Sequence, residues 1–294
     1  MRIEDWDEYK HFIGAVTEAA SNISSSPALT KITSYIFNAG GKKLRPLTIM
    51  LSCGAAGGDY KSATNACLAI EAIHTASLAH DDILDDGKMR RNQQTIHEKY
   101  GMAAAILCGD FLIAKSIEWI SVYENQVVWD FGHSGALLSE GEIIDASIKR
   151  GEMKAEEYLE CIYKKTAALF EISAKIGARI AQPNDENQIN AFGTFGYEFG
   201  MAYQIIDDLL EDFGLYKDKE SGILSDSLFS IHLRSMPYAE AAKKTIMEAE
   251  AYLGRSKEAL SGISASPSKD KLFDLIDYVN GLMDKVRKSP ELAV

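Results

Sequence analysis

The sequence predicts an all-α fold in which one domain is built as a helical bundle. Apolar residues recur close to the helical period almost throughout, as in Trp6, Tyr9, Ile13 and Val16, whereas the alternating pattern of strands is nearly absent. The chain has 294 residues, of which 46% are apolar, and this is enough to bury a large core. Because no connection has the length of an interdomain linker and no internal repeat is found, residues 1–294 are expected to form a single domain.

Glycine, proline and serine mark the ends of the predicted helices, which number about ten or more. The breaks fall at residues 40–41, 57–58, 87–94, 183–185, 214–222 and 261–268. Between them lie long apolar helices that should form the walls of the bundle: 63–86, 103–122, 154–181 and 188–213.

Composition limits the class of function. The 43 acidic residues outnumber the 31 basic ones and give a net charge of −12, which argues against nucleic acid as the main partner. No stretch approaches the length of about eighteen uncharged apolar residues that a membrane span requires. Residues 1–10 carry several acids and no apolar run, so no signal peptide is expected either, and we expect a cytoplasmic location.

The four cysteines agree with that location. Cys53, Cys67, Cys108 and Cys161 lie far apart in apolar, helical settings, without the paired spacing that is typical of metal sites. We expect reduced thiols that pack in the core, and neither disulfides nor zinc ligands.

The strongest chemical signal is a cluster of acids at the end of the helix 63–86. Asp81 and Asp85 lie one turn apart and share a face, so their carboxylates converge, and Asp82 lies beside them. Negative charges at a helix C-terminus also oppose the helix dipole, so a bound cation would relieve both effects. The alternative interpretation is an acidic helix end that is simply solvated.

A second cluster of the same kind closes the helix 188–213. Asp207 and Glu211 repeat the i, i+4 spacing, and Asp208 lies beside Asp207. If the two clusters face each other across a cavity, their carboxylates can hold Mg²⁺ ions that take their remaining ligands from water and phosphate oxygens. The two clusters together predict a magnesium site for a diphosphate leaving group.

Basic residues complete the pattern. Arg90 and Arg91 follow the first acidic cluster, and the segment 40–46, Gly-Gly-Lys-Lys-Leu-Arg-Pro, opens another helix. The forked guanidinium suits phosphate oxygens, and glycines next to a helix N-terminus allow backbone N–H groups to approach an anion. Taken alone, the segment 40–46 is also consistent with ordinary surface charge.

With these motifs the chain resembles the trans-isoprenyl diphosphate synthases, the family of the farnesyl, geranylgeranyl and longer-chain enzymes. The matching segments have the order and spacing of that family. They are residues 40–46, residues 74–97 with the acids and the paired arginines, residues 109–112 (Gly-Asp-Phe-Leu), Lys165 with Thr166, and residues 203–208 (Tyr-Gln-Ile-Ile-Asp-Asp). The resemblance implies a bundle of the isoprenoid synthase type with a central cavity.

The resemblance also implies two diphosphate sites. Isopentenyl diphosphate would be bound by Lys42, Arg45, His74 and Arg91. The second substrate, an allylic diphosphate such as geranyl, farnesyl or geranylgeranyl diphosphate, would be held by Arg90, Lys165 and Gln204.

Metal ions and catalytic residues follow from the same resemblance. About two or three Mg²⁺ ions would bind the acids of the two clusters, which are Asp81, Asp82, Asp85, Asp207, Asp208 and Glu211. Lys165, Thr166 and Gln204 would act in catalysis. A plainer interpretation stays open for some of these residues, because His74, Lys165, Thr166 and the neighbouring Tyr203 are also acceptable as ordinary packed residues of their helices.

In that family the reaction begins with ionisation. Metal ions neutralise the departing diphosphate while the allylic carbon becomes positive in a cavity without water. The double bond of isopentenyl diphosphate attacks this carbon, and a proton is lost to the released diphosphate. Thr166, Gln204 and backbone carbonyls would turn the negative ends of their dipoles toward the cation. The resemblance further implies a homodimer, although the periodicity of the sequence does not identify its interface.

Residues that precede Asp81 are expected to set the product length. One helical turn advances about 5.4 Å, close to one extended isoprene unit, so the helix acts as a ruler for the growing chain. Ala76 and Ser77 lie about one turn below Asp81 and are small, and Ile73 lies deeper. Because enzymes of the family with shorter products commonly have an aromatic residue at this level, we expect a C25 product, with C20 and C30 to C35 as neighbours. The alternative is that Ala76 and the alanines below it merely allow close helix packing.

Several positions depart from the family pattern. Lys43 stands where arginine is usual, Glu211 replaces an aspartate, and Asn92 and Gln94 replace a glycine and a proline. The segment 214–233 also lacks the usual Gly-Lys pair. Lys217 or Lys219 would have to reach the allylic diphosphate instead.

Two rival functions follow from these observations. A non-catalytic regulatory subunit of a heteromeric synthase would explain the altered segment 214–233, but it has little reason to keep two acidic clusters and the basic residues. A class I terpene cyclase also ionises diphosphates at an acidic motif. It does not need Lys42, Arg45 and His74 for a second diphosphate, and it would not consume isopentenyl diphosphate.

Overall fold

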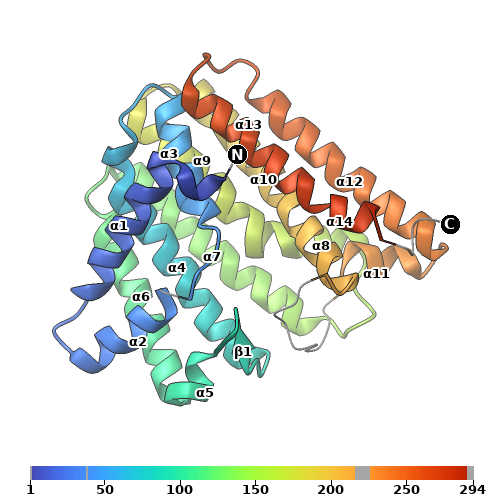
Figure 1. Ribbon diagram of the computed structural model, residues 1–294, viewed down its shortest axis with the longest axis horizontal. Coiled ribbons are helices and arrows are strands. Elements are labelled where there is room, and N and C mark those ends of the chain that lie inside the picture. The colour runs from blue at the N-terminus through green and yellow to red at the C-terminus, as the bar shows by residue number, and fades with distance from the viewer. Residues whose placement is uncertain (1, 38, 216–225, 290–294) are drawn as a thin grey trace.

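The all-α fold is confirmed by the structure, a computed structural model that describes residues 2–37, 39–215 and 226–289 (Figure 1). Its α-helices are α1 (Asp7–Ser21), α2 (Pro27–Phe37), α3 (Leu44–Ala55), α4 (Thr64–Leu84), α5 (Ile96–Tyr100), α6 (Met102–Ile120), α7 (Asn125–Ser147), α8 (Ala155–Ile162), α9 (Ala168–Ala181), α10 (Glu186–Asp212), α11 (Leu228–Leu233), α12 (Tyr238–Ala259), α13 (Pro267–Leu282) and α14 (Asp284–Arg287). Two 3₁₀ turns, η1 (Ile3–Asp5) and η2 (Tyr60–Ala63), and one π-helical segment, η3 (Tyr163–Ala167), complete the helices. In these ranges the only strands are β1 (Met89–Arg90) and β2 (Gln93–Gln94).

The predicted walls are present, with one correction. Helices α4, α6 and α10 match three of the predicted helices, with ends that differ by one or two residues. The fourth, 154–181, is interrupted, because α8 passes into the π-helical segment η3 before α9 begins. Short π-helical turns are often found at functional positions, and the average helical period does not reveal them. Helix α7, which the sequence analysis does not count among the walls, packs against η3 and α9.

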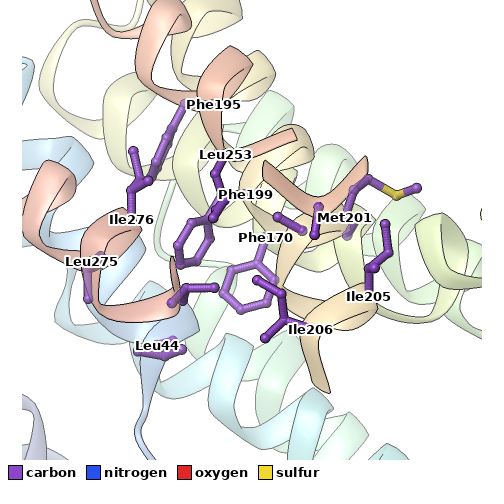
Figure 2. Packing of buried hydrophobic residues seen from close by; sticks show 14 of the residues in the cluster. Leu44, Phe170, Phe195, Phe199, Met201, Ile205, Ile206, Leu253, Leu275 and Ile276 are labelled. Atoms are coloured by element: carbon purple, nitrogen blue, oxygen red, sulfur yellow. The ribbon is translucent and has the colours of Figure 1, made fainter. Parts of the chain in front are cut away.

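Aromatic side chains of α9 and α10 form the core next to the site. Phe170 of α9 meets Phe199 of α10 edge to face with ring centroids 5.3 Å apart, and Phe195 stacks on Phe199 at 5.7 Å. Figure 2 shows these rings beside Leu275 and Ile276 of α13. All five side chains are fully buried, and rings of this size contribute strongly to burial and fix the position of the helices that carry them.

Two glycines of α10 allow a close helix contact at the site. A Cβ atom at Gly196 would lie 2.5 Å from the carbonyl oxygen of Phe170, and one at Gly200 would lie 2.6 Å from Cα of Ala167. Neither position has room for a methyl group, because protein interiors are close-packed. Helix α10 therefore lies directly on η3, and Gln204, one turn after Gly200, comes next to that segment.

A short hairpin carries the two predicted arginines. β1 and β2 pair antiparallel, with Arg90 opposite Gln93. The residues of the turn between them, Arg91 and Asn92, have positive φ angles of 51° and 61°. A two-residue hairpin turn of this kind requires left-handed backbone, which asparagine tolerates better than most residues. The asparagine that replaces the family's glycine therefore suits this turn.

The late segment 214–233 is only partly described, since residues 216–225 fall outside the described ranges and Lys217 and Lys219 fall with them. Residues 228–233, for which no helix was predicted, form the helix α11. Ser227 caps this helix by accepting a hydrogen bond from the backbone N–H of Ser230 at 2.9 Å, and its own hydroxyl donates to Asp212 at 2.5 Å. The described part of the segment is thus tied to the end of α10.

The cysteines and the helix lengths agree with the sequence analysis. Cys53, Cys67, Cys108 and Cys161 are buried and free, as predicted. In the part of the chain that the structure describes, none of the helices combines the length and the apolar character that a membrane crossing needs.

Candidate active site

The first acidic cluster forms the last turn of α4, as predicted. The backbone N–H of Asp85 donates to the carbonyl oxygen of Asp81 at 2.9 Å, so the two side chains lie one turn apart. Asp81 is half-buried, and burial together with the nearby charge of Glu142 raises the pKa of its carboxyl to about 7. A cation bound at this turn would favour the ionised carboxylate.

Asp82 has a different partner. Its side chain is 7% exposed, and Arg90 Nε donates to its Oδ1 at 2.7 Å. Successive residues of a helix point about 100° apart, so Asp82 leaves the face that Asp81 occupies. Burial raises the pKa of Asp82 and the charge of Arg90 opposes this shift. The ion pair fixes the hairpin residue Arg90 against the end of α4.

Lys165 of η3 lies against two acids of α7. Its Nζ is 2.5 Å from Oδ2 of Asp145 and 2.9 Å from Oε2 of Glu142. Burial disfavours the charge of Lys165, but the two carboxylates outweigh burial and raise the pKa of the ammonium group. Because Glu142 and Lys165 also lie near Asp81, the structure brings Lys165 to the first acidic cluster.

The second acidic cluster lies on the last turns of α10. Asp208 accepts hydrogen bonds on both oxygens, from the Tyr158 hydroxyl at 2.5 Å and from Gln204 Nε2 at 2.7 Å. Burial raises the pKa of Asp208 to about 7, although both donors favour its ionised form. Asp207 and Glu211 lie one turn apart on the neighbouring face of the helix.

Thr166 joins this second cluster through Gln204. The Thr166 hydroxyl donates to Gln204 Oε1 at 2.7 Å. Thr166 directly follows Lys165, so η3 connects the acids around Asp81 with those of α10. The structure thus brings the three predicted catalytic residues Lys165, Thr166 and Gln204 into one region.

Basic side chains surround His74 of α4. Arg45 Nη1 lies 3.3 Å from His74 Nε2, and the guanidinium of Arg45 lies over the Phe170 ring, 4.6 Å from its centroid. Because arginine can only donate, His74 Nε2 must accept, and the imidazole proton is assigned to Nδ1. Burial, followed by the charges of Arg45 and Arg91, holds the pKa of His74 well below its usual range, so the ring is neutral at pH 7.

This basic cluster is suited to an anion. The positive charges that act on His74 belong to Arg45, Arg91, Lys43 and Arg90. The buried Nε of Arg45 has no hydrogen-bond partner among the described residues. Because buried donors are nearly always paired in folded proteins, this one points to a ligand with acceptor oxygens.

The glycine-basic loop, residues 40–43 before α3, fits around Arg91. Arg91 Nη1 donates to the carbonyl oxygen of Gly40 at 2.6 Å. A Cβ atom at Gly41 would lie 2.6 Å from the same nitrogen, and Gly41 has a positive φ of 110°. The backbone angle therefore favours glycine at position 41, and a side chain there would displace the guanidinium of Arg91.

The two lysines of this loop have different surroundings. Lys43, which replaces the family's usual arginine, is buried and forms an ion pair with Glu71, with Nζ 2.7 Å from Oε1. Lys42 is exposed, and its ammonium lies 5.0 Å from the centroid of the Tyr278 ring of α13. Lys42 is therefore the lysine of the pair that solvent and ligands can reach.

The predicted ruler residues point to different neighbours. Ile73 packs against α7, because a Cβ atom at Gly135 would lie 2.9 Å from Ile73 Cδ1. Ser77 is half-buried on the side of Asp81. Ala76 is fully buried and lies about 140° around the helix from Asp81. It belongs to the apolar cluster that α4 shares with α6.

The acids fit magnesium that arrives with a diphosphate. Among the described residues, no group of three or more metal-ligating side chains converges on one point. Mg²⁺ prefers carboxylate oxygens and usually keeps several waters and substrate phosphates as its remaining ligands. The raised pKa values of Asp81 and Asp208 also indicate carboxylates whose charge the protein compensates incompletely.

Three side chains of the site were not predicted from the sequence. Glu142 and Asp145 of α7 bind Lys165, and Tyr158 of α8 binds Asp208. Asp145 and Tyr158 have partners 20 and 50 residues away along the chain. No local pattern marks them, since Tyr158 reads as an ordinary apolar position of its helix.

Comparison with known proteins agrees with this geometry. Residues 26–258 match the polyprenyl synthetase family. The geranylfarnesyl diphosphate synthase of Methanosarcina mazei is 41% identical over 279 residues, which cover 95% of this chain and 94% of that protein. The geranylgeranyl diphosphate synthase of Sulfolobus acidocaldarius is 35% identical over 282 residues, with 90% and 82% covered.

Solved structures give the same result. A geranyltranstransferase from Methanosarcina mazei superposes with a TM-score of 0.83 at 39% identity, over 96% of this chain and 99% of that one. A geranylgeranyl pyrophosphate synthetase from Geoglobus acetivorans superposes with a TM-score of 0.83 at 30% identity, over 93% and 98%.

Proposed function

The chain belongs to the polyprenyl synthetase family and is a trans-prenyltransferase, and on this premise we propose that it makes an all-trans C25 diphosphate. It would do so by condensing isopentenyl diphosphate with an allylic diphosphate. One observation supports this proposal above all: the protein has two separate groups of side chains that suit diphosphates. One is the basic cluster around His74, and the other is the pair of acidic clusters suited to Mg²⁺.

Isopentenyl diphosphate is assigned to the basic cluster. Arg45 supplies a buried N–H without a protein partner, and Arg91 lies close enough to depress the pKa of His74. Lys42 is exposed at the start of α3 and can close over the diphosphate. The neutral His74 keeps Arg45 in place and leaves its own Nδ1–H as a donor.

The allylic diphosphate is assigned to the acidic side. Asp81 and Asp85 of α4 and Asp207 and Glu211 of α10 are the acids that we expect to ligate Mg²⁺ directly. Asp82 and Asp208 belong to the predicted metal-binding set, but Arg90 and Tyr158 bind them. We therefore assign them to hold their neighbours in position.

Cations of the chain complete this second site. Arg90 is fixed by Asp82 with part of its guanidinium left for phosphate oxygens. Lys165 is held by Glu142 and Asp145, with three ammonium protons to share among acceptors. Gln204 lies on the same side, next to Thr166.

The reaction follows from these assignments. Mg²⁺ held by Asp81, Asp85, Asp207 and Glu211 would supply Lewis-acid assistance to the departure of the diphosphate. The C–O bond of the allylic diphosphate breaks with both electrons going to diphosphate, and the oxygens of Thr166 and Gln204 face the allylic cation. The double bond of isopentenyl diphosphate then forms the new C–C bond, and the proton that it loses goes to the released diphosphate.

The product length is assigned to the residues below Asp81. Ser77 is small and Ile73 lies two turns down, so the growing chain meets no aromatic residue on this side of α4. Ala76 is buried in the apolar cluster that includes α6, so its small side chain affects how closely α4 and α6 pack. This favours the alternative that Ala76 serves helix packing. The C25 assignment agrees with the name of the Methanosarcina mazei relative.

The rival functions are less well supported. A terpene cyclase handles one diphosphate and has no need of the unpartnered Arg45 Nε and the basic residues around it. A regulatory subunit would leave both acidic clusters without a role. Its only support, the altered segment 214–233, includes residues outside the described ranges.

A homodimer is proposed from an exposed apolar face. Met102, Ile106, Ile113 and Ile117 form one stripe of α6 and are 51%, 44%, 37% and 55% exposed. Trp129 of α7 is 62% exposed. An exposed apolar stripe of this kind is typical of a protein contact. We also propose that residues 1–294 form one domain and that the location is cytoplasmic, in keeping with the free buried cysteines.

The test of the function is direct. The purified protein is incubated with Mg²⁺, labelled isopentenyl diphosphate and farnesyl or geranylgeranyl diphosphate, and the dephosphorylated products are resolved by chain length. A discrete C25 product is expected, and Asp81→Asn should abolish it while the exposed Asp270→Asn should not. C20 alone would overturn the length but keep the reaction, absence of elongation would favour the regulatory subunit, and cyclic products without consumption of isopentenyl diphosphate would favour the cyclase.

A further inference from the structure

Four side chains form a continuous chain of hydrogen bonds from α8 through α10 to η3. The Tyr158 hydroxyl donates to Oδ2 of Asp208 at 2.5 Å, and Gln204 Nε2 donates to Oδ1 of the same carboxylate at 2.7 Å. The Thr166 hydroxyl donates to Gln204 Oε1 at 2.7 Å. Tyr158 is 2% exposed and stands at one end of this series of hydrogen bonds, and Thr166 stands at the other end.

The direction of these bonds is fixed by chemistry. Both oxygens of Asp208 accept hydrogen bonds, so Gln204 turns its NH₂ group to Asp208 and its carbonyl oxygen to the Thr166 hydroxyl. The Thr166 hydroxyl has one proton, and it donates this proton in the hydrogen bond to Gln204 Oε1. The lone pairs of the Thr166 oxygen are left as the negative end of a dipole. With the amide reversed, the Gln204 oxygen would face the carboxylate and Thr166 would lose its acceptor.

We propose that Tyr158 is a positioning residue for the ionisation step, which holds Asp208 and, through Gln204, turns the Thr166 oxygen toward the developing allylic cation. This inference rests on the proposed function, since it concerns the same reaction. Tyr158 touches neither substrate, and its effect passes through the three side chains that follow it.

The surroundings of Tyr158 support this role. Burial and the neighbouring Asp208 raise the pKa of its phenol well above the usual range, so the hydroxyl stays a donor at working pH. The ring packs in the main apolar cluster, which leaves the hydroxyl little freedom to turn away. Asp208 without this donor would be a half-buried carboxylate that has lost one of its two hydrogen bonds, and such groups move or change partners.

The backbone also keeps the chain of bonds in place. Gly200 lets α10 approach η3 so closely that a Cβ there would lie 2.6 Å from Cα of Ala167. Thr166 and Gln204 therefore face each other across a closely packed contact between η3 and α10. The hydrogen bonds select one arrangement of the two side chains.

The test compares two tyrosines that lose the same hydroxyl. Tyr158→Phe keeps the packed ring and removes only the donor to Asp208. Tyr163→Phe is the matched control, because Tyr163 donates to the carboxylate of Glu171 at 3.3 Å and has no bond to Asp208. Single-turnover rates with bound farnesyl diphosphate are measured, so that product release does not hide the chemical step.

For Tyr158→Phe we expect a single-turnover rate lower by about tenfold, with KM for isopentenyl diphosphate changed by less than about twofold. Tyr163→Phe should match the unmodified protein in both. Equal rates for Tyr158→Phe and the control, in a protein that does elongate, would overturn this inference alone, whereas an unmodified protein that does not elongate would overturn the proposed function.

A second measurement separates positioning from packing. Thr166→Val removes the last oxygen of the chain, so in its presence the Tyr158 hydroxyl has nothing left to orient. The double variant Tyr158→Phe/Thr166→Val should therefore be no slower than Thr166→Val by more than about twofold. Rate losses that multiply would show that Tyr158 acts independently of Thr166 and would overturn the proposal.

Discussion

Arg45 Nη1 donates a hydrogen bond to His74 Nε2 at 3.3 Å, and this contact joins the first turn of α3 to α4, the helix that carries Asp81. The same guanidinium lies over the Phe170 ring. The guanidinium of Arg45 therefore already contacts His74 and Phe170, while its buried Nε has no hydrogen-bond partner among the described residues. A group so restrained is pre-ordered for a diphosphate oxygen.

Arg45→Ala should raise KM for isopentenyl diphosphate by about tenfold or more, because a charge-assisted hydrogen bond to phosphate is lost. KM for the allylic substrate should change much less. Arg255→Ala is the matched control, since Arg255 also lies over an aromatic ring, that of Tyr252 at 4.4 Å. Steady-state kinetics with each substrate varied in turn will check this, and equal changes in both KM values would speak against the assignment.

Asp82 and Arg90 should act as one unit. Asp82→Asn and Arg90→Gln each weaken binding of the allylic diphosphate, and the double variant should be little worse than the poorer single one. If Asp82 instead ligated Mg²⁺, Asp82→Asn would raise the Mg²⁺ concentration needed for half-maximal rate, and Arg90→Gln would not. Glu198→Gln, which breaks a comparable ion pair with Arg255, controls for loss of a salt bridge alone.

Magnesium should stabilise the fold more at high pH than at low pH. The folded-state pKa of Asp81 and of Asp208 is about 7, against an ordinary value of 3.8. Between these values the folded protein binds more protons than the unfolded chain, so the free energy of unfolding falls as pH rises from about 4 to about 7. Mg²⁺ offsets that loss, because it pairs directly with the ionised carboxylate of Asp81 and its positive charge also favours the ionised form of the nearby Asp208.

Thermal unfolding with and without Mg²⁺ at about pH 5.5 and about pH 8 will measure this dependence, with KCl at matched ionic strength as the control. We expect the rise in Tm caused by Mg²⁺ to be clearly larger at the higher pH. Equal rises at both values would contradict the prediction.

Product length should respond to the helix below Asp81. Ala76→Phe should shift the product from C25 toward C20, because the ring must enter either the path of the chain or the contact between α4 and α6. Ile73→Ala should leave the product unchanged or lengthen it, since it opens space next to Gly135. Product chain length and Tm are measured together, and a folded Ala76→Phe variant with an unchanged product would refute the ruler.

The exposed face of α6 should hold the dimer together. Ile106→Glu combined with Ile113→Glu places two charges in the stripe and should produce monomers in size-exclusion chromatography with light scattering. Met247→Glu is the control, because Met247 is 58% exposed on α12, outside that face. A dimer that survives the double variant but not the control would move the interface away from α6.

Much of the site was predictable because it is local in sequence. The i, i+4 spacing of Asp81 and Asp85 is a property of any helix and survives in the structure. The Gly40 to Pro46 segment and the paired arginines are likewise recognised by order and spacing. The hairpin at Arg91 and Asn92 was not predicted, because strands of two paired residues each are too short to show an alternating apolar pattern.

The partners of these residues were not predictable. Asp82 and Asp208 look equivalent to their neighbours in sequence, yet each points about 100° away from the expected metal-binding face and binds Arg90 or Tyr158. The interruption of the helix 154–181 by η3 was also invisible, since one extra residue in a turn hardly changes the apolar period.

The sequence by itself determined the all-α class, the two acidic helix ends, the basic loop and, through them, the chemistry of diphosphates, because each depends on residues within one or two turns of a helix. Only the tertiary structure decided that Asp82 binds Arg90, that Lys165 is paired with acids of α7 and that the Tyr158 hydroxyl donates to Asp208. Those choices depend on contacts between residues as far apart as Tyr158 and Asp208, and such contacts arise when the packing of Phe170, Phe199 and the glycines of α10 sets the distance between helices.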